Sequence, residues 1–145
     1  MADEKKVKIK LGARPKSFKH TVSFPMVDGT VGCIEVTYKY RTRREFAGFI
    51  DDLQATAKTQ ADAYAAKAKA QLEQDGTVPM PTQKELLEFG LSGSVDFIMA
   101  SVEGWNLDEK FDRTAVEQLA DEVPAAIPSI MEAYRGAINE GRLGN

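Results

Sequence analysis

The residue types that most often carry out chemistry are rare in this chain of 145 residues. It contains one cysteine, Cys33, and one histidine, His20, too few to build a disulfide framework or a zinc site. Both fall in strand-like stretches, and no Gly-x-Ser-x-Gly turn is present to expose a nucleophile. A catalytic Cys–His pair is therefore disfavoured, because a cysteine in a strand usually packs as a small hydrophobe.

The sequence also gives no support for a phosphate-binding loop or for a catalytic pair of carboxylates. The chain lacks the Gly-x-Gly-x-x-Gly and Gly-Lys-Ser/Thr loops that cradle phosphates. Its carboxylate pairs, such as Asp51 with Asp52 and Asp121 with Glu122, are sequence neighbours on expected helices, where side chains point about 100° apart. We therefore expect a protein that is not an enzyme and that holds no cofactor and no metal.

Composition is typical of a soluble globular domain. Hydrophobic residues make up 43% of the chain and charged residues 28%, and 145 residues suit a single domain. The longest apolar runs, 63–66 and 97–100, are four residues long, so we expect neither a membrane span nor a secretion signal. The low cysteine content fits a reducing cytoplasm.

Charge is distributed unevenly along the chain. Residues 1–44 carry 11 Lys and Arg against 4 Asp and Glu, whereas residues 45–145 carry 8 against 18. A basic arm on an acidic body can bind nucleic acid, but the aromatic residues needed for base stacking are also core candidates here. The favoured interpretation is a solvated strand face that is attracted to acidic helices, and this pattern disfavours nucleic-acid binding.

Residues 1–44 alternate apolar and polar side chains with the period of β-strands. The pattern predicts strands around 22–26 and 33–40, joined at Asp28-Gly29, a dipeptide typical of hairpin turns. A further strand is predicted at 7–11, where Val7, Ile9 and Leu11 alternate with lysines. These strands would form a small antiparallel sheet with one apolar face that needs a cover.

From Thr42 onward the apolar residues recur at helical spacing. Thr42 and Glu45 match a capping box, and the apolar stripe continues until Asp75-Gly76, which predicts one helix of about 30 residues. Its first half can cover the sheet. Its second half is rich in alanine between residues 55 and 70 and offers little apolar area, so we expect it to project from the domain.

Three further helical segments are expected after a proline-containing connector at 77–81. They are 82–103, as two pieces or one bent helix interrupted at 92–94; a short helix opened by a capping box at 114–117; and a last helix from Pro124 or near Pro128 to Gly141. The sequence therefore predicts one α+β domain over 1–145, with a small amino-terminal sheet in 1–44 and about four helices in 45–145.

The most specific local feature is the segment 102–112, which places the only tryptophan in a loop between helices. Trp105, Leu107 and Phe111 are expected to anchor this loop on the core, and the alternative is an aromatic side chain at an interface with a partner.

This segment is followed by Leu119, Asp121-Glu122-Val123-Pro124, Ile127, an Ile130-Met131-x-x-Tyr134 helix and a terminal Gly-Arg-Leu-Gly-Asn. Together these features resemble the tail assembly chaperones of long-tailed bacteriophages, most clearly over residues 95–145 and more loosely near 42–49. The resemblance implies a non-enzymatic protein of the infected bacterial cytoplasm, absent from the mature virion. It also implies that the protein binds the tape measure protein, keeps it soluble and helps it engage tail tube subunits.

A tape measure protein is a long helical client, so its chaperone needs a shallow apolar surface and is expected to form a homo-oligomer. We expect residues 53–72 to serve self-association or client capture. The candidate partner-binding residues are Leu53, Tyr64, Leu72, Trp105, Leu107, Phe111 and Tyr134. An equally weighted alternative is that the long helix is merely an exposed alanine-rich helix. The competing functions are a minor structural protein of the virion tail and, less favoured, a small nucleic-acid-binding protein.

Overall fold

The computed structural model describes residues 6–141. Within that range the elements are β1 (Ser17–Pro25), β2 (Val31–Lys39), α1 (Arg43–Asp75), α2 (Gln83–Ser101), β3 (Val102–Trp105), α3 (Arg113–Glu122) and α4 (Ala126–Glu140). The predicted α+β class, with a small antiparallel sheet and one long helix, is confirmed. Residues 1–5 of the basic arm and 142–145 of the terminal motif lie outside the described residues.

β1 and β2 form the predicted hairpin around the Asp28-Gly29 turn. Gly29 has a φ of 87°, a backbone conformation that glycine adopts without steric cost. The Asp28 carboxylate accepts a hydrogen bond from the backbone N–H of Thr30 at 3.0 Å, which closes the turn. The two strands pair from Ser17 opposite Lys39 to Pro25 opposite Val31, so alternate residues of both strands share one buried face.

The third strand is β3, not the strand predicted at 7–11. Val7, Ile9 and Leu11 lie in irregular backbone with 77% to 91% of their surface exposed. β3 instead pairs antiparallel with β2, giving the sheet order β1-β2-β3. The sequence predicts a helix through Glu103 because Val102 continues the helical spacing of apolar residues, but the free edge of β2 supplies hydrogen-bond partners that an extended backbone satisfies instead.

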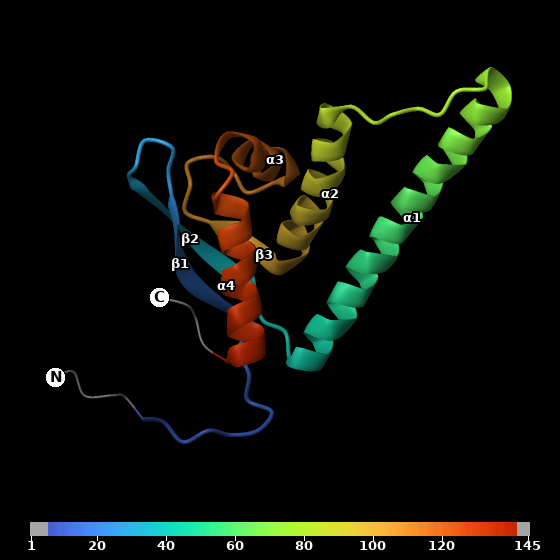
Figure 1. Cartoon of the computed structure of the whole chain (residues 1–145). Coiled ribbons are helices and arrows are strands. Elements are labelled where there is room, and N and C mark those ends of the chain that lie inside the picture. The colour runs from blue at the N-terminus through green and yellow to red at the C-terminus, as the bar shows by residue number, and fades with distance from the viewer. Residues whose placement is uncertain (1–5, 142–145) are drawn as a thin grey trace.

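α4 covers the apolar face of the sheet (Figure 1). The ring of Tyr134 on α4 stacks on that of Tyr38 on β2, with their centroids 5.3 Å apart. The prediction that the first half of α1 covers the sheet is wrong. Only the first turns of α1 reach the core, where Phe46 and Phe49 contact the ring of Phe97 on α2.

Capping residues account for where the helices begin and end. Thr42 and Glu45 form the predicted capping box of α1, and Gly76 ends that helix with a φ of 72°. α2 is one continuous helix capped by Thr82. The N-cap of α3 is Asp112, two residues before the predicted N-cap Thr114, and its carboxylate accepts a hydrogen bond from the backbone N–H of Ala115 at 2.8 Å.

The chain between residues 50 and 94 contributes no fully buried residue. α1 diverges from the body along its length, and the connector 76–82 returns the chain to the start of α2 (Figure 1). The expectation that the second half of the long helix projects is confirmed. None of the helices over residues 6–141 is both long enough and apolar enough to cross a membrane.

Candidate protein-binding surface

The lone histidine and cysteine do not meet. His20 pairs with Val36 and Cys33 pairs with Ser23, so the two residues are three ladder steps apart, or roughly 10 Å at about 3.3 Å per residue. Over residues 6–141 there is also no group of three or more His, Cys, Asp and Glu side chains arranged to hold a metal ion.

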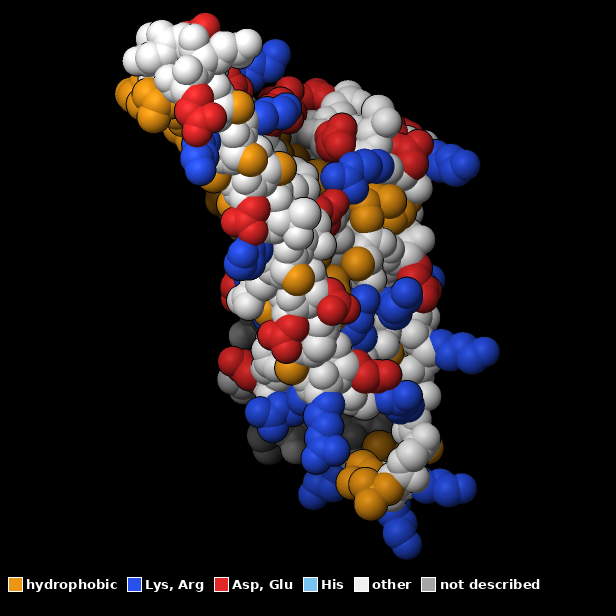
Figure 2. Space-filling view, turned by 90° about the vertical axis from the view of Figure 1, so that its right-hand side faces the viewer, with side chains coloured by type: hydrophobic (Ala, Val, Ile, Leu, Met, Phe, Trp, Pro, Cys, Tyr) orange, Lys and Arg blue, Asp and Glu red, His pale blue; other side chains and the backbone are white. Residues whose placement is uncertain are grey.

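Large hydrophobic side chains are exposed where α1 ends and α2 begins. We define the distal apolar surface by its members, which are 44% to 86% exposed: Leu72, Val78, Met80, Leu86 and Phe89. Hydrophobic side chains gather beside the distal end of α1, whereas the outward face of α1 shows small apolar side chains between charged ones (Figure 2). A grouping of this kind marks a site of protein contact more often than scattered single residues do.

The local sequence of α2 explains why these side chains are left uncovered. Leu86 and Phe89 are three residues apart and lie on the same side of α2, whereas Leu87 points about 100° away from Leu86. The facing stretch of α1 supplies mainly alanine, and its one large ring, Tyr64, meets Phe89 edge to face with 5.5 Å between the centroids.

The three candidate residues of α1 lie in different environments. Leu53 is partly buried against the core, Tyr64 is partly buried against Phe89, and Leu72 is 45% exposed. They therefore offer unequal surface to a partner, and Leu72 offers the most. The sequence does not mark Val78, Met80, Leu86 or Phe89 as partner-binding residues, because helical spacing predicts a helix in early α2 but not which of its side chains are covered.

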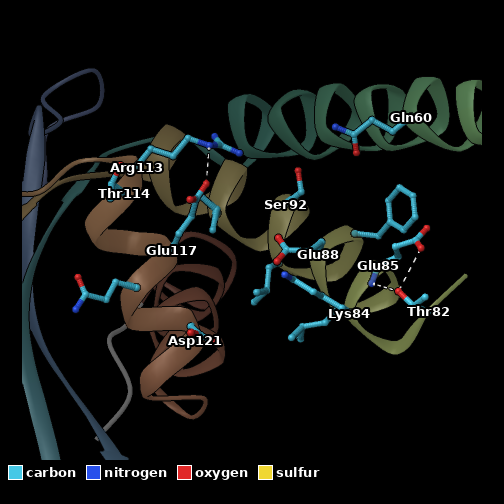
Figure 3. A pocket seen from close by; sticks show the side chains of 15 residues that line it. Gln60, Thr82, Lys84, Glu85, Glu88, Ser92, Arg113, Thr114, Glu117 and Asp121 are labelled. Atoms are coloured by element: carbon cyan, nitrogen blue, oxygen red, sulfur yellow. Dashed lines mark hydrogen bonds and ion pairs between the residues drawn. The ribbon is translucent and has the colours of Figure 1, made fainter.

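A groove with a volume of about 1240 Å³ lies between α2 and α3, bounded on one side by α1 (Figure 3). Its apolar lining comes from α2, at Leu87, Phe89, Leu91 and Val95. The charged residues that line it are Lys84, Glu85, Glu88, Arg113, Glu117 and Asp121. Arg113 is paired with Glu117 at 3.3 Å and with Asp96 at 2.9 Å, so the unpaired charge along the groove is mainly negative.

Trp105 and its neighbours hold the segment after β3 against the body. The Trp105 indole N–H donates to the backbone oxygen of Glu109 at 2.7 Å, and its ring meets Phe111 edge to face at 5.1 Å. Trp105, Leu107 and Phe111 are partly buried against the core. The backbone N–H of Glu35 donates to the Asn106 side chain at 2.9 Å, which extends the contact with β2.

Tyr134 is fully buried and takes part in a polar network within the fold. Its hydroxyl donates to the backbone oxygen of Lys39 at 2.9 Å and accepts from Arg41 at 3.1 Å. Burial raises the pKa of Tyr134 above its ordinary value. The expectation that Tyr134 contacts a partner does not fit this position, because neither its ring nor its hydroxyl reaches the surface.

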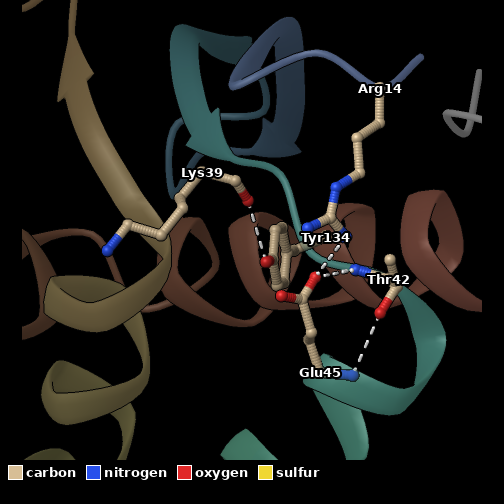
Figure 4. Close-up of polar contacts among 5 residues, drawn as sticks. All are labelled: Arg14, Lys39, Thr42, Glu45 and Tyr134. Atoms are coloured by element: carbon tan, nitrogen blue, oxygen red, sulfur yellow. Dashed lines mark hydrogen bonds and ion pairs between the residues drawn. The ribbon is translucent and has the colours of Figure 1, made fainter. Parts of the chain in front are cut away.

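The junction between β2 and α1 also fixes the carboxyl-terminal end of the amino-terminal arm (Figure 4). Arg14 pairs with Glu45 at 2.9 Å, beside the capping hydrogen bond that Glu45 accepts from the Thr42 backbone. The Thr42 hydrogen bond and the nearby Arg14 charge lower the pKa of Glu45. The arm is therefore attached at the base of α1, far along that helix from the distal apolar surface.

Comparison with known proteins gives one finding. A family model described as phage tail assembly chaperone matches residues 1–145, the whole chain. No curated protein and no solved structure matches it.

Proposed function

This chain belongs to the phage tail assembly chaperone family, and from that premise we propose that it binds the tape measure protein and keeps it soluble during tail assembly. In this proposal the protein acts in the bacterial host cytoplasm without transforming a substrate, helps the tape measure protein engage tail tube subunits, and is absent from the finished virion.

The observation that carries the proposal is the distal apolar surface. A long helical client has apolar stripes that aggregate when exposed to water, and a shallow apolar surface can cover one of them. Leu72, Met80 and Leu86 offer large side chains for this contact. The alanine-rich part of α1 allows another helix to approach closely, while Lys58 and Asp62 keep its flank hydrated.

Co-expression with the tape measure protein tests the proposal. The soluble fraction of the client is measured with wild-type chaperone, with Met80→Asp/Leu86→Asp, and with the matched control Val27→Asp/Val31→Asp. The control residues are also exposed but lie at the hairpin turn, away from the distal apolar surface. We expect wild type and control to keep the client soluble and the distal variant to lose most of that effect, because buried carboxylates oppose apolar contact.

Two results would contradict the proposal: an insoluble client beside wild-type chaperone, or full solubility beside the distal variant. Circular dichroism of each variant shows that the fold is retained. Mass spectrometry of purified virions should detect no copies of the chain, and its presence there would favour a structural role in the tail.

A further inference from the structure

The described part of the amino-terminal arm, residues 6–16, combines exposed apolar side chains with unopposed positive charge. Val7, Ile9 and Leu11 are 77% to 91% exposed and alternate with Lys6, Lys8 and Lys10. No ion pair joins these three lysines to any residue between 6 and 141, and residues 6–16 contain no Asp or Glu. Such a segment is incomplete by itself, because its apolar face has no cover.

The groove between α2 and α3 has the complementary character. Leu87, Phe89 and Leu91 supply apolar surface. Glu88 and Asp121 contribute carboxylates from its two walls that form no ion pair over residues 6–141. Positive charge on the arm and negative charge around the groove attract each other across water.

The arm of one chain is held away from the groove of the same chain. Arg14 pairs with Glu45, and the backbone N–H of Tyr40 donates to the oxygen of Lys16 at 3.0 Å, which fixes the end of the arm at the base of the molecule. Figure 1 shows the arm leaving at that end, opposite the first turns of α2 and the helix α3. An arm that binds in this groove would therefore come from a second copy of the chain.

We propose that residues 6–11 of one copy bind in the α2–α3 groove of a second copy. In an extended segment, alternate side chains point to opposite sides, so Val7, Ile9 and Leu11 enter the groove while the lysines stay at its mouth near Glu88 and Asp121. The contact joins two different surfaces, so it closes as a reciprocal dimer or continues from copy to copy.

This contact shares one side chain with the distal apolar surface, because Phe89 both lines the groove and belongs to that surface. Leu87 lines the groove and Leu86 belongs to the distal apolar surface, and their side chains point about 100° apart on α2. The other members of the distal apolar surface do not line the groove, and self-association is measurable with the chaperone alone.

Charge reversal on each side of the contact tests the inference. Sedimentation velocity over a concentration series at low salt compares wild type with an arm variant, Lys6→Glu/Lys8→Glu/Lys10→Glu, and a groove variant, Glu88→Lys/Asp121→Lys. Both sets of residues lie outside the core, so the fold should be unchanged. We expect wild type to associate and each variant to associate at least about tenfold more weakly. Added salt should weaken the wild-type association.

Matched controls reverse the same number of charges elsewhere. They are Lys19→Glu/Lys39→Glu/Lys110→Glu for the arm and Asp52→Lys/Glu73→Lys for the groove, all at exposed positions that do not line it. Both controls should associate like wild type.

Mixing the arm variant with the groove variant gives the sharpest result. The acidic arm of the first fits the basic groove of the second, and the unchanged basic arm of the second fits the acidic groove of the first. Association should therefore be stronger in the mixture than for either variant alone. The inference is overturned if wild type is monomeric, if the arm or groove variant associates like wild type, or if a control associates as weakly as the variants. It is overturned as well if the mixture stays dissociated. It is also overturned if the groove variant loses client solubility but keeps self-association, which would assign the groove to the client.

Discussion

At the scale of single residues, the polar groups buried beneath α4 decide how the strands, the helix junction and α2 fit together. Arg41 donates to the backbone oxygen of Ala100 at 2.8 Å and to the Ser101 hydroxyl at 3.1 Å, while its guanidinium lies 4.0 Å from the centre of the Phe49 ring. Tyr134 joins this network to the end of β2. Over residues 6–141, no buried side-chain nitrogen or oxygen lacks a hydrogen-bond partner. Removing one of these groups therefore leaves its partner unpaired, which lowers the free energy of unfolding.

We predict that Tyr134→Phe lowers the free energy of unfolding by about 1–3 kcal/mol. The change keeps the ring stacked on Tyr38 but leaves the Lys39 carbonyl and one Arg41 N–H without their partner. Urea denaturation measures the loss. Tyr40→Phe is the control, because the Tyr40 hydroxyl makes no hydrogen bond within residues 6–141, and it should change stability by less than about 0.5 kcal/mol. Equal effects of the two changes would show that the Tyr134 hydroxyl contributes nothing specific.

At the scale of elements, signals contained in a few neighbouring residues predict structure well. Thr42 with Glu45, Thr82 and the glycines at 76 and 141 mark helix ends because capping uses backbone groups within one turn. β3 was not predicted, because its pairing with β2 depends on a partner that lies far away in the sequence. The alternation at 7–11 is a genuine strand pattern that lacks a pairing partner within residues 6–141.

Two glycine substitutions should change stability in opposite directions. Gly93 lies inside α2, and a Cβ there would meet no atom within 4 Å, so Gly93→Ala should stabilise the protein by about 0.5–1 kcal/mol. Gly141 ends α4 with a φ of 74°, so Gly141→Ala should cost about 1 kcal/mol. Thermal unfolding measures both, and a destabilising Gly93→Ala would show that α2 needs flexibility at the site where the sequence predicts an interruption.

At the scale of the whole molecule, the chain divides into a packed body and a distal helix pair that contributes little to the core. The sequence indicated this division through the alanine content of residues 55–70, and it identified Leu72 as a candidate contact. It could not identify Val78, Met80 and Leu86 as an exposed surface. Whether an apolar side chain is buried depends on how the neighbouring elements pack, and the sequence alone does not give that packing. The same limit applies to the groove, whose walls come from helices separated in sequence.

Excision of the distal segment should therefore separate stability from client binding. Tyr64 and Phe89 are in ring contact, so residues 66–87 can be replaced by a flexible Gly/Ser linker of about six residues, which spans up to about 20 Å. The core side chains all remain, and the melting temperature should stay within about 5 °C of wild type. Client solubility should fall to the level seen with Met80→Asp/Leu86→Asp, because both changes remove the same surface. A shortened protein that unfolds would show that the distal helices support the body. A shortened protein that still keeps the tape measure protein soluble would move the client contact to the body, where the partly exposed side chains around Trp105 are the next candidates.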